Sequence, residues 1–286
     1  MSAPGSAEWS RRMTASKVAG VLGLSKWASP YSTWLRMKGL DPGDENRNAD
    51  DKARGHYLED GVTRWWADQH PGVSIDGTQT VFDRDGWASS TPDAHGELDG
   101  ERFVFDAKTD ESEDDWGDEP PAYYLAQLYW QMWCADVKVA YIACLFGRPH
   151  MRFREWRVEW DEQVGAGIVA ACREFYDSLA QDDPPPLDAS VATYDAIRRQ
   201  HPDIDREATV ELAVDAAREY VDSDAAHKAA EARARAAKSA VLAHMGRARI
   251  ATCNDLKVAR RQPNKYGVSL VCTADTIPTH ESETTP

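Results

Sequence analysis

The sequence predicts an α/β domain with a mixed central sheet flanked by helices, followed by an α-rich C-terminal extension. Segments with helical spacing alternate with strand-like segments through the first part of the chain, an order typical of α/β folds. All eleven Trp residues lie between Trp9 and Trp160, and the proline-rich stretch 182–188 then marks the end of the aromatic core. We therefore predict one domain over residues 1–185 and a helical extension over 186–286.

The first domain is expected to begin with helices. Residues 13–25 and 29–40 are typical of two short helices, and Ser29 followed by Pro30 supplies the cap and first-turn residues that favour the second one. Over 53–70, large apolar residues recur at the i, i+4, i+7 and i+8 spacing of one helix face. These residues are Leu58, Val62, Trp65 and Trp66.

The rest of the domain is expected to supply a sheet and two more helices. Five strands are predicted, over 73–83, 87–99, 102–109, 138–146 and 151–160. The acidic stretch 110–119 is expected to form a solvated loop, with Trp116 packing back on the domain. A helix should follow from about residue 121, and a last one should cover 162–180.

The C-terminal extension has a different composition. Residues 206–245 are rich in Ala, Glu, Arg and Lys with a weak heptad-like pattern, which favours an extended helix or a helical hairpin. Gly246 can terminate this helix. A small basic hairpin is expected after it, because 246–265 holds six basic residues and one acidic residue.

Composition limits the classes of function. The formal net charge of −15 argues by itself against a nucleic-acid partner, because Lys and Arg dominate phosphate binding. The basic stretch 246–265 nevertheless leaves room for a DNA groove, especially if divalent cations offset some carboxylates. No secretory start is recognised, and the longest unbroken apolar run, 139–146, is too short to span a membrane. The five Cys residues lack CxxC spacing, which favours free thiols in a reducing cytoplasm.

A lysine and three acidic residues form the candidate site. On the strand 102–109, Asp106 and Lys108 emerge side by side, because side chains alternate across a strand. Asp93 begins the adjoining strand, and Glu59 borders the apolar face of the long helix. The simplest interpretation of the Asp-x-Lys pair alone is a surface ion pair, worth about 0–1 kcal/mol.

Three carboxylates in one place would repel one another unless a divalent cation lay among them. Mg²⁺ prefers oxygen ligands and suits phosphate chemistry, and Mn²⁺ is expected to substitute for it. The predicted metal ligands are Glu59, Asp93, Asp106 and the backbone carbonyl of Ala107. In that arrangement, Lys108 would help to position and activate the attacking water.

The order of these motifs resembles the PD-(D/E)XK nuclease superfamily, with its restriction-endonuclease-like core. The closest resemblance within it is to the YqaJ-type viral recombinases related to the exonuclease of bacteriophage lambda. The strings RGHYLE, TPDA, FDAKT and YYLAQLYWQM carry the resemblance, which spans roughly residues 9–180. It implies catalytic positions at Glu59, Asp93, Asp106, Lys108 and the motif glutamine Gln127, with Asp106 standing where many relatives have Glu.

The resemblance also implies DNA contacts. The opening helix of the family contacts phosphate through an Arg and a Ser, which match Arg12 and Ser16. Arg54 is a further candidate phosphate ligand, and Tyr124 and Gln131 share the helix face of the motif glutamine. Simpler interpretations stay open: Ser16 as a helix cap, Arg54 as a partner of nearby acids, and Gln131 as a partner of backbone groups.

Together these observations predict a Mg²⁺-dependent deoxyribonuclease. The resemblance implies a double-strand exonuclease that degrades one strand from the 5′ end for recombination, in a phage or prophage setting in the bacterial cytoplasm. It also implies a ring-shaped homo-oligomer and a single-strand annealing protein as partner. Three alternatives stay open: an endonuclease on the same fold, a binding module without catalysis, and a plain Asp106–Lys108 ion pair in an unrelated protein.

Overall fold

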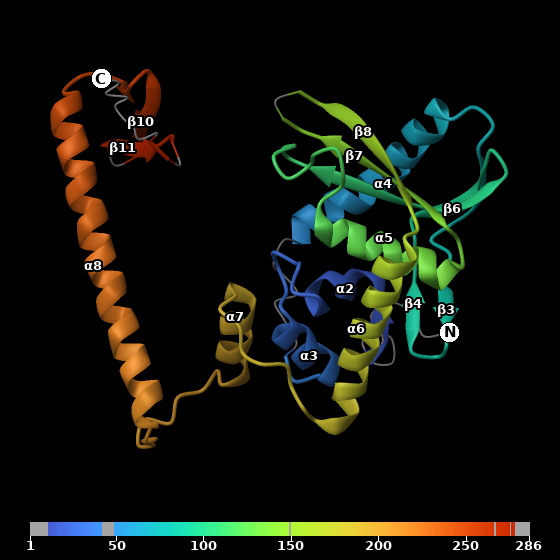
Figure 1. Ribbon diagram of the computed structural model, residues 1–286, viewed down its shortest axis with the longest axis horizontal. Helices are drawn as coiled ribbons and strands as arrows, with labels where there is room; N and C mark the ends of the chain where they lie inside the picture. The colour runs from blue at the N-terminus through green and yellow to red at the C-terminus, as the bar shows by residue number, and fades with distance from the viewer. Residues whose placement is uncertain (1–10, 42–48, 149, 266, 275, 278–286) are drawn as a thin grey trace, which may run out of the picture. The chain divides into compact units, whose positions relative to one another are not determined.

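The computed structural model describes residues 11–41, 49–148, 150–265, 267–274 and 276–277. The chain divides into two compact units, Met1–Ile204 and Asp205–Pro286, which are described separately (Figure 1). No helix in the described ranges is both long enough and apolar enough to cross a membrane.

A five-stranded mixed sheet forms the centre of the first unit. Its strands, in spatial order, are β2 (Ser74–Thr78), β5 (Ala94–Leu98), β6 (Glu101–Asp110), β7 (Val139–Phe146) and β8 (Arg152–Glu159). Neighbouring strands are antiparallel except β6 and β7, which are parallel and therefore need a crossover connection. Helix α5 (Ala122–Ala135) supplies it. This mixed sheet flanked by helices confirms the predicted fold class.

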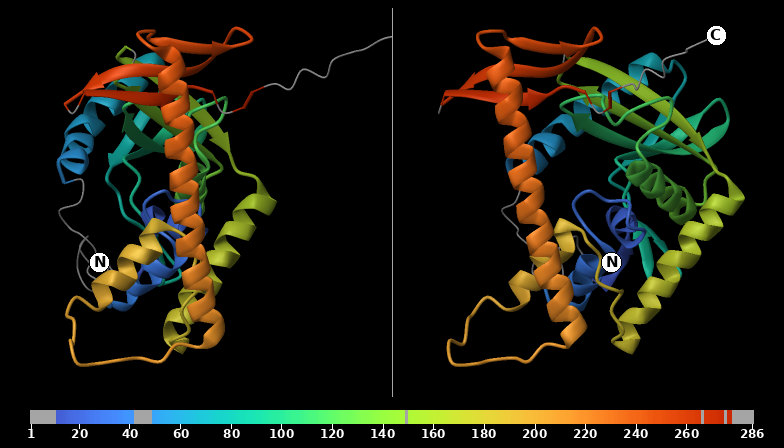
Figure 2. Two further views of the ribbon diagram at one scale, coloured as in Figure 1. Left: turned by 90° about the vertical axis from the view of Figure 1, so that its left-hand side faces the viewer. Right: turned by 60° about the vertical axis from the view of Figure 1, so that its left-hand side comes forward.

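Helices cover both faces of this sheet, and the alternation of side chains along β6 determines what each helix meets (Figures 1 and 2). Phe105 packs against Trp66 of α4 (Ala49–Gln69), with ring centroids 4.7 Å apart. Val104 points to the other face and packs in one buried cluster with Leu128 of α5. Asp106 therefore lies on the α5 face of the sheet.

The other elements of the first unit form a second layer of helices beside a small sheet. The sheet contains β1 (Met13–Thr14), β4 (Ala88–Ser90) and β3 (Phe82–Arg84) in that order. The helices are α2 (Ala15–Val21), α3 (Pro30–Lys38), α6 (Glu162–Gln181) and α7 (Val191–Gln200). Ser29 caps α3 as expected, in a reciprocal capping box with Ser32.

Two predicted strands are each divided between the two sheets. The stretch 73–83 splits into β2 and β3, and 87–99 splits into β4 and β5. Gln79 makes the first break with a left-handed φ of 50°, and its N–H donates to the carbonyl of Asp93 at 3.2 Å. Local apolar pattern does not specify which sheet a strand joins, so the sequence suggested two long strands where the chain makes four short ones.

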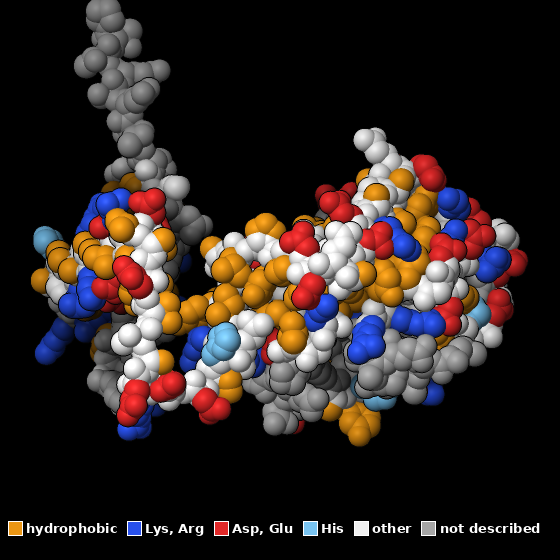
Figure 3. Space-filling model, turned by 90° about the horizontal axis from the view of Figure 1, so that it is seen from below, with side chains coloured by type: hydrophobic (Ala, Val, Ile, Leu, Met, Phe, Trp, Pro, Cys, Tyr) orange, Lys and Arg blue, Asp and Glu red, His pale blue; other side chains and the backbone are white. Residues whose placement is uncertain are grey.

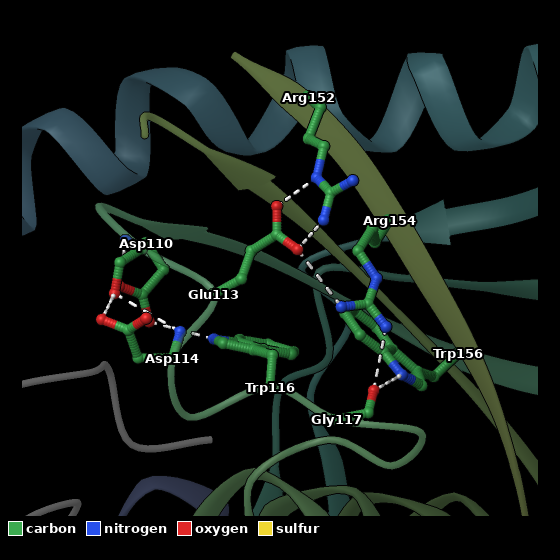
Figure 4. A network of polar contacts seen from close by, with 9 residues as sticks. Asp110, Glu113, Asp114, Trp116, Gly117, Arg152, Arg154 and Trp156 are labelled. Atoms are coloured by element: carbon green, nitrogen blue, oxygen red, sulfur yellow. Dashed lines mark hydrogen bonds and ion pairs between the residues drawn. The ribbon is translucent and has the colours of Figure 1, made fainter. Parts of the chain in front are cut away.

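The acidic stretch 110–119 is a largely solvent-exposed loop, as predicted, but part of it is also tied to the domain. The Glu113 carboxylate pairs with Arg152 and Arg154 of β8, and the carbonyl of Gly117 accepts a hydrogen bond from Arg154 at 2.9 Å (Figure 4). Trp116 is 5% exposed and lies 4.8 Å from the Trp156 ring between centroids, which confirms that it packs back on the domain. Arginines on β8 therefore hold the loop against the domain through Glu113 and Gly117, while most of its acidic residues stay exposed.

The first unit extends beyond the boundary predicted at residue 185, because α7 packs on α3. The Ser29 and Thr193 hydroxyls lie 2.7 Å apart and both residues are buried. Arg199 binds the buried carboxylate of Asp41 with two hydrogen bonds, of 2.8 and 2.7 Å. The proline-rich stretch is therefore a connection within the first unit.

The second unit consists of one long helix and one small sheet. Helix α8 runs from Val214 to Met245, and Gly246 ends it as predicted. The strands β9 (Ile250–Cys253), β10 (Leu256–Asn264) and β11 (Gly267–Cys272) form an antiparallel sheet with β10 in the centre. The expected basic hairpin corresponds to β10 and β11, with β9 added as a third strand.

Candidate active site

The strand register brings Asp93 and Asp106 together. Ala94 pairs with Phe105 in the antiparallel β5–β6 ladder, so the next positions outward are Asp93 and Asp106. Residues opposite each other on antiparallel strands share a face of the sheet. An Asp93 carboxylate oxygen also accepts a 2.7 Å hydrogen bond from the N–H of Ala107, which fixes it at the end of the ladder.

Asp106 is held by three side chains. It is 2% exposed, and its carboxylate forms an ion pair with Lys108. From α5, Gln131 donates its amide at 2.9 Å and Gln127 donates its amide at 3.1 Å, so two consecutive helix turns carry the donors. A buried carboxylate needs such partners, because removing it from water without them costs several kcal/mol.

Lys108 is a charged group in a largely buried place. Its ammonium donates to the Ala107 carbonyl at 3.2 Å and lies 5.3 Å from the centre of the Tyr124 ring. Burial acts to lower the pKa of Lys108, but the carboxylates of Asp106 and Asp93 outweigh burial and hold this pKa above its usual value. The lysine therefore stays protonated across the neutral pH range.

Asp93 is the less well compensated of the two carboxylates. Burial, followed by the negative charge of Asp106, raises the pKa of Asp93 from 3.8 to about 7. Lys108 and the hydrogen bond from Ala107 act in the opposite direction, and Glu59 adds a smaller repulsion. Without a further positive charge, this pair of carboxylates binds a proton near neutral pH.

This donor set fits a divalent cation in part. Two close carboxylates with excess negative charge, next to the Ala107 carbonyl, are the hard oxygen donors that Mg²⁺ prefers. Glu59 instead has a carboxylate oxygen 3.3 Å from Nδ1 of His56 on its own helix. No group of three or more His, Cys, Asp or Glu side chains among the described residues is arranged to hold a metal. The residues that suit a divalent cation are therefore Asp93, Asp106 and Ala107, through their oxygen atoms.

Comparison with known proteins found a protein-family model that matches the part of the chain containing this site. The family model of the YqaJ-like viral recombinase domain matches residues 9–138, a range that contains all the site residues named above. Residues 9–138 are therefore similar to the YqaJ-like viral recombinase domain. The resemblance inferred from the sequence is thereby confirmed.

One individual protein is also similar to this chain, at low sequence identity. The uncharacterized protein YqaJ of Bacillus subtilis (strain 168) is 24% identical over 198 residues, which are 67% of this chain. The match spans 61% of that relative's length, less than two thirds.

Two solved structures are also similar. An alkaline exonuclease (LHK-Exo) from Laribacter hongkongensis has 19% identity and a TM-score of 0.47, over 60% of this chain and 90% of that chain. A phage related exonuclease from Haemophilus somnus 129PT has 13% identity and a TM-score of 0.41, over 60% of this chain and 96% of that chain.

The residues predicted to contact DNA near the N-terminus and on α4 make contacts outside the carboxylate pair. Arg12 forms an ion pair with Asp83 of β3. The Ser16 hydroxyl lies 3.2 Å from that of Thr14, and Thr14 holds the N-cap position of α2, so Ser16 is not the cap. Arg54 is exposed on α4. Next to Ser16, burial lowers the pKa of Lys17 to about 8.

The two α5 residues assigned to DNA contact have different environments. Tyr124 is partly buried beside Lys108, and burial raises the pKa of Tyr124 to about 12, so its phenol keeps its proton. Gln131 is 1% exposed and binds Asp106, which is incompatible with direct contact to a nucleic acid. Its role is to orient Asp106.

Sequence reasoning missed Gln79. Its side-chain amide donates to the second carboxylate oxygen of Asp93 at 3.0 Å, and its left-handed backbone places it there. No motif or apolar periodicity marks this residue, since it lies in a polar connection between two strands. The sequence reasoning placed Gln79 inside the single predicted strand 73–83, which the structure breaks at this residue.

Proposed function

We propose that this protein is a Mg²⁺-dependent DNA nuclease that hydrolyses phosphodiester bonds at the Asp93–Asp106–Lys108 site. The observation that carries the proposal is the convergence of two coupled carboxylates and a protonated lysine at the end of adjoining strands, within a YqaJ-like domain. Phosphodiester hydrolysis needs positive charge near the scissile phosphate, and such a site supplies it.

Asp93, Asp106 and the Ala107 carbonyl would hold the Mg²⁺, with Glu59 as a further ligand from α4. When bound, the cation supplies Lewis-acid stabilisation of the phosphate charge and a more acidic water. Mn²⁺, which accepts the same oxygen ligands, would substitute for it. The raised pKa of Asp93 supports this assignment, because burial and the nearby charge of Asp106 disfavour its ionised form and a bound cation would offset both effects.

The side chains of the chain itself perform the positioning. Lys108, fully charged, donates hydrogen bonds to a phosphate oxygen and orients the attacking water. Gln127 is the more accessible of the two amides on Asp106 and reaches toward the same space. Gln131 fixes the Asp106 carboxylate from within the core, so that the donor atoms are in place before substrate arrives.

We also propose that cleavage proceeds from the 5′ end of duplex DNA, leaving a 3′ single strand for recombination. The match to the YqaJ-like viral recombinase domain, together with the resemblance to lambda-type exonucleases, supports this polarity. A ring-shaped homo-oligomer and a single-strand annealing protein as partner follow from the same resemblance. Light scattering coupled to size-exclusion chromatography would measure the subunit number.

The deciding experiment is digestion of linear duplex DNA labelled at either end, beside a closed circle, with Mg²⁺ and with EDTA. We expect Mg²⁺-dependent loss of the 5′ label and an intact circle. Loss of the 3′ label first would reverse the polarity. Cutting of the circle would assign an endonuclease, and an absence of cleavage with any divalent metal would contradict the nuclease proposal.

Substitution of the lysine tests the site itself. Lys108→Ala is expected to reduce cleavage at least about 100-fold, because the transition state loses a buried positive charge. The matched control is Lys138→Ala, which removes an exposed lysine paired with Glu162 at 3.5 Å. Near wild-type cleavage by Lys108→Ala would show that the chemistry takes place elsewhere.

A further inference from the structure

The second unit has a strongly uneven distribution of charge. Between Asp205 and Glu231, three basic residues stand against eight acidic ones. Between Arg233 and Lys265, nine basic residues stand against a single acid, Asp255. We call residues 233–265 the basic end. In a chain with a net charge of −15, this concentration of positive charge is exceptional.

The two regions also differ in how their charges are compensated. At the acidic end, Arg218 pairs with Asp215 at 3.1 Å and Lys228 pairs with Asp224 at 2.6 Å. At the basic end, no described carboxylate lies within ion-pair distance of Arg249, Lys257 or Arg260. The face in Figure 3 shows acidic and basic side chains interspersed over the first unit, so such one-sided charge is not general.

Three of these uncompensated cations line one hollow in the small sheet. A cavity of about 360 Å³ is bordered by Arg249, Lys257, Arg260 and Thr273, together with Ile250 and Ala259. The β9–β10 pairing has an irregularity between Lys257 and Ala259, which bends β10 at this place. The hollow is lined almost entirely by apolar atoms, so the aliphatic stems of these side chains border it. Their three positive charges nevertheless belong to neighbouring positions of one small sheet, which favours phosphate groups as partners.

The basic end is too long for a single small anion. The stretch of α8 from Arg233 to Met245 covers about 18 Å at 1.5 Å per residue. It carries Arg233, Arg235 and Lys238, all exposed, and it leads directly into the strands that line the cavity. Arg233 and Arg235 lie on opposite sides of the helix, whereas Arg235 and Lys238, at i and i+3, are neighbours on its surface. Phosphates along one DNA strand repeat about every 3.4 Å along the axis, so this pair can meet more than one of them.

We propose that the basic end is a second DNA-binding site that grips the backbone phosphates of duplex DNA without reading its sequence. Base stacking on aromatic rings, which single-strand binders use, has no platform among the described residues of this region. The large apolar residues of this part of α8, Val241, Leu242 and Met245, are partly or fully buried, which argues against their insertion into a membrane surface. This inference concerns the second unit alone and does not depend on the chemistry of the first.

The test measures binding by the full-length protein in EDTA, so that cleavage does not interfere. Fluorescence anisotropy with a labelled 30-base-pair duplex of arbitrary sequence is recorded from 50 to 300 mM KCl. The triple variant Arg249→Gln, Lys257→Gln, Arg260→Gln is expected to bind about tenfold more weakly. The slope of log Kd against log salt should fall by roughly 2 to 3, as expected when about three phosphate contacts are lost.

A charge-matched control separates this site from a general effect of net charge. The triple variant Arg206→Gln, Arg218→Gln, Lys228→Gln removes the same three charges from the acidic end and should bind like the wild type. Equal losses in both triple variants would contradict a defined site. Unchanged affinity and slope in the basic-end variant would contradict the proposal outright.

Two further arms keep the test decisive. If the cavity variant fails to fold by circular dichroism, Arg235→Gln with Lys238→Gln replaces it, because both side chains are exposed on α8. This pair should reduce the slope of log Kd against log salt by roughly 2.

Vesicles containing phosphatidylserine provide the competing polyanion. Loss of vesicle binding with unchanged DNA binding in the variants would assign the surface to membranes and overturn the proposal.

Discussion

Asp93 and Asp106 lie opposite each other on two strands, but their negative charges are compensated to different degrees. Asp106 has Lys108 and two amides from α5. Asp93 has only the Ala107 N–H and the Gln79 amide, both neutral donors. Because burial and the charge of Asp106 raise the pKa of Asp93 to about 7, the ionised form of Asp93 is destabilised by the fold. This part of the candidate site therefore opposes stability.

Asp93→Asn should stabilise the metal-free protein while abolishing cleavage. In the unfolded chain Asp93 ionises near 3.8 and in the folded chain near 7, so its penalty develops as pH rises through this window and is complete above it. At pH 8 we expect a gain of about 1 kcal/mol, a Tm increase of roughly 2–4 °C. The gain should shrink as pH falls toward 4.

Differential scanning calorimetry in EDTA at pH 8 and pH 5 measures this difference. Asp68→Asn, an exposed carboxyl on α4, serves as the control and should leave Tm unchanged at both pH values. A lower Tm for Asp93→Asn at pH 8 would mean that the hydrogen bonds from Ala107 and Gln79 outweigh the electrostatic penalty.

The sequence was a good guide to the site wherever strand geometry sufficed. Asp106 and Lys108 share a face by alternation, and the start of the neighbouring strand placed Asp93 beside them. The contribution of Gln131 was only partly predicted, since helix periodicity located it beside Gln127 without specifying its burial. Gln79 depends on a left-handed backbone in a connection, which no periodic pattern encodes.

The loop 110–119 has a structural role that its acidic composition did not indicate. Seven acidic residues between Asp110 and Glu119 suggested solvation, but arginines of β8 and one tryptophan tie the loop to the sheet. The indole N–H of Trp116 donates to Asp110 at 3.0 Å, and Asp110 ends the strand that carries Lys108 (Figure 4). The docked loop therefore stabilises the strand end next to the candidate site.

Substitutions of Trp116 should separate packing from hydrogen bonding. Trp116→Phe keeps a ring among Tyr124, Phe146 and Trp156 but loses the hydrogen bond to Asp110, at a cost of about 1 kcal/mol. Trp116→Ala also leaves a cavity and should cost about 3–5 kcal/mol. Urea unfolding measures both free energies.

The control for these variants is Trp27→Phe, which alters a tryptophan that is 55% exposed and should have little effect. Equal stability of Trp116→Ala and the wild type would mean that the loop is detached in solution. Cleavage rates should fall with Trp116→Ala more than with Trp27→Phe, because the end of β6 carries the site.

The type of each helix or strand was predicted more accurately than the strand with which it pairs. The helices from 122 to 135 and 162 to 181 and the strands β6, β7 and β8 lie close to where local pattern placed them. The division of two predicted strands between two sheets follows from contacts made far away in sequence, such as β1 pairing with β4. Such pairings depend on tertiary packing, which a window of neighbouring residues does not contain.

The whole molecule contains two units of opposite character. The first has a net acidic surface and a buried aromatic core, and the second is a nearly fully exposed helix with a small sheet. Composition located this change of character correctly but placed the boundary too early. The Trp and Phe residues end before α7, whereas α7 is held by a hydroxyl pair and a buried ion pair that composition does not reveal.

Truncation should therefore distinguish two boundaries. A fragment of residues 1–204 is expected to unfold cooperatively, whereas a fragment of 1–185 lacks Arg199 and so loses the ion pair that Arg199 forms with Asp41. Breaking a buried ion pair in this way costs about 3–5 kcal/mol, a large share of the stability of one domain. Thermal unfolding followed by circular dichroism compares the fragments.

Arg199→Ala in the longer fragment isolates the ion pair from the rest of α7. It should lower Tm part of the way toward the shorter fragment, while Arg198→Ala, at the exposed neighbour, should have little effect. If fragment 1–185 unfolds at the same temperature as fragment 1–204, α7 does not contribute to the stability of the first unit. If only the longer one unfolds cooperatively, α7 is required for the first unit to fold, and this unit ends after α7.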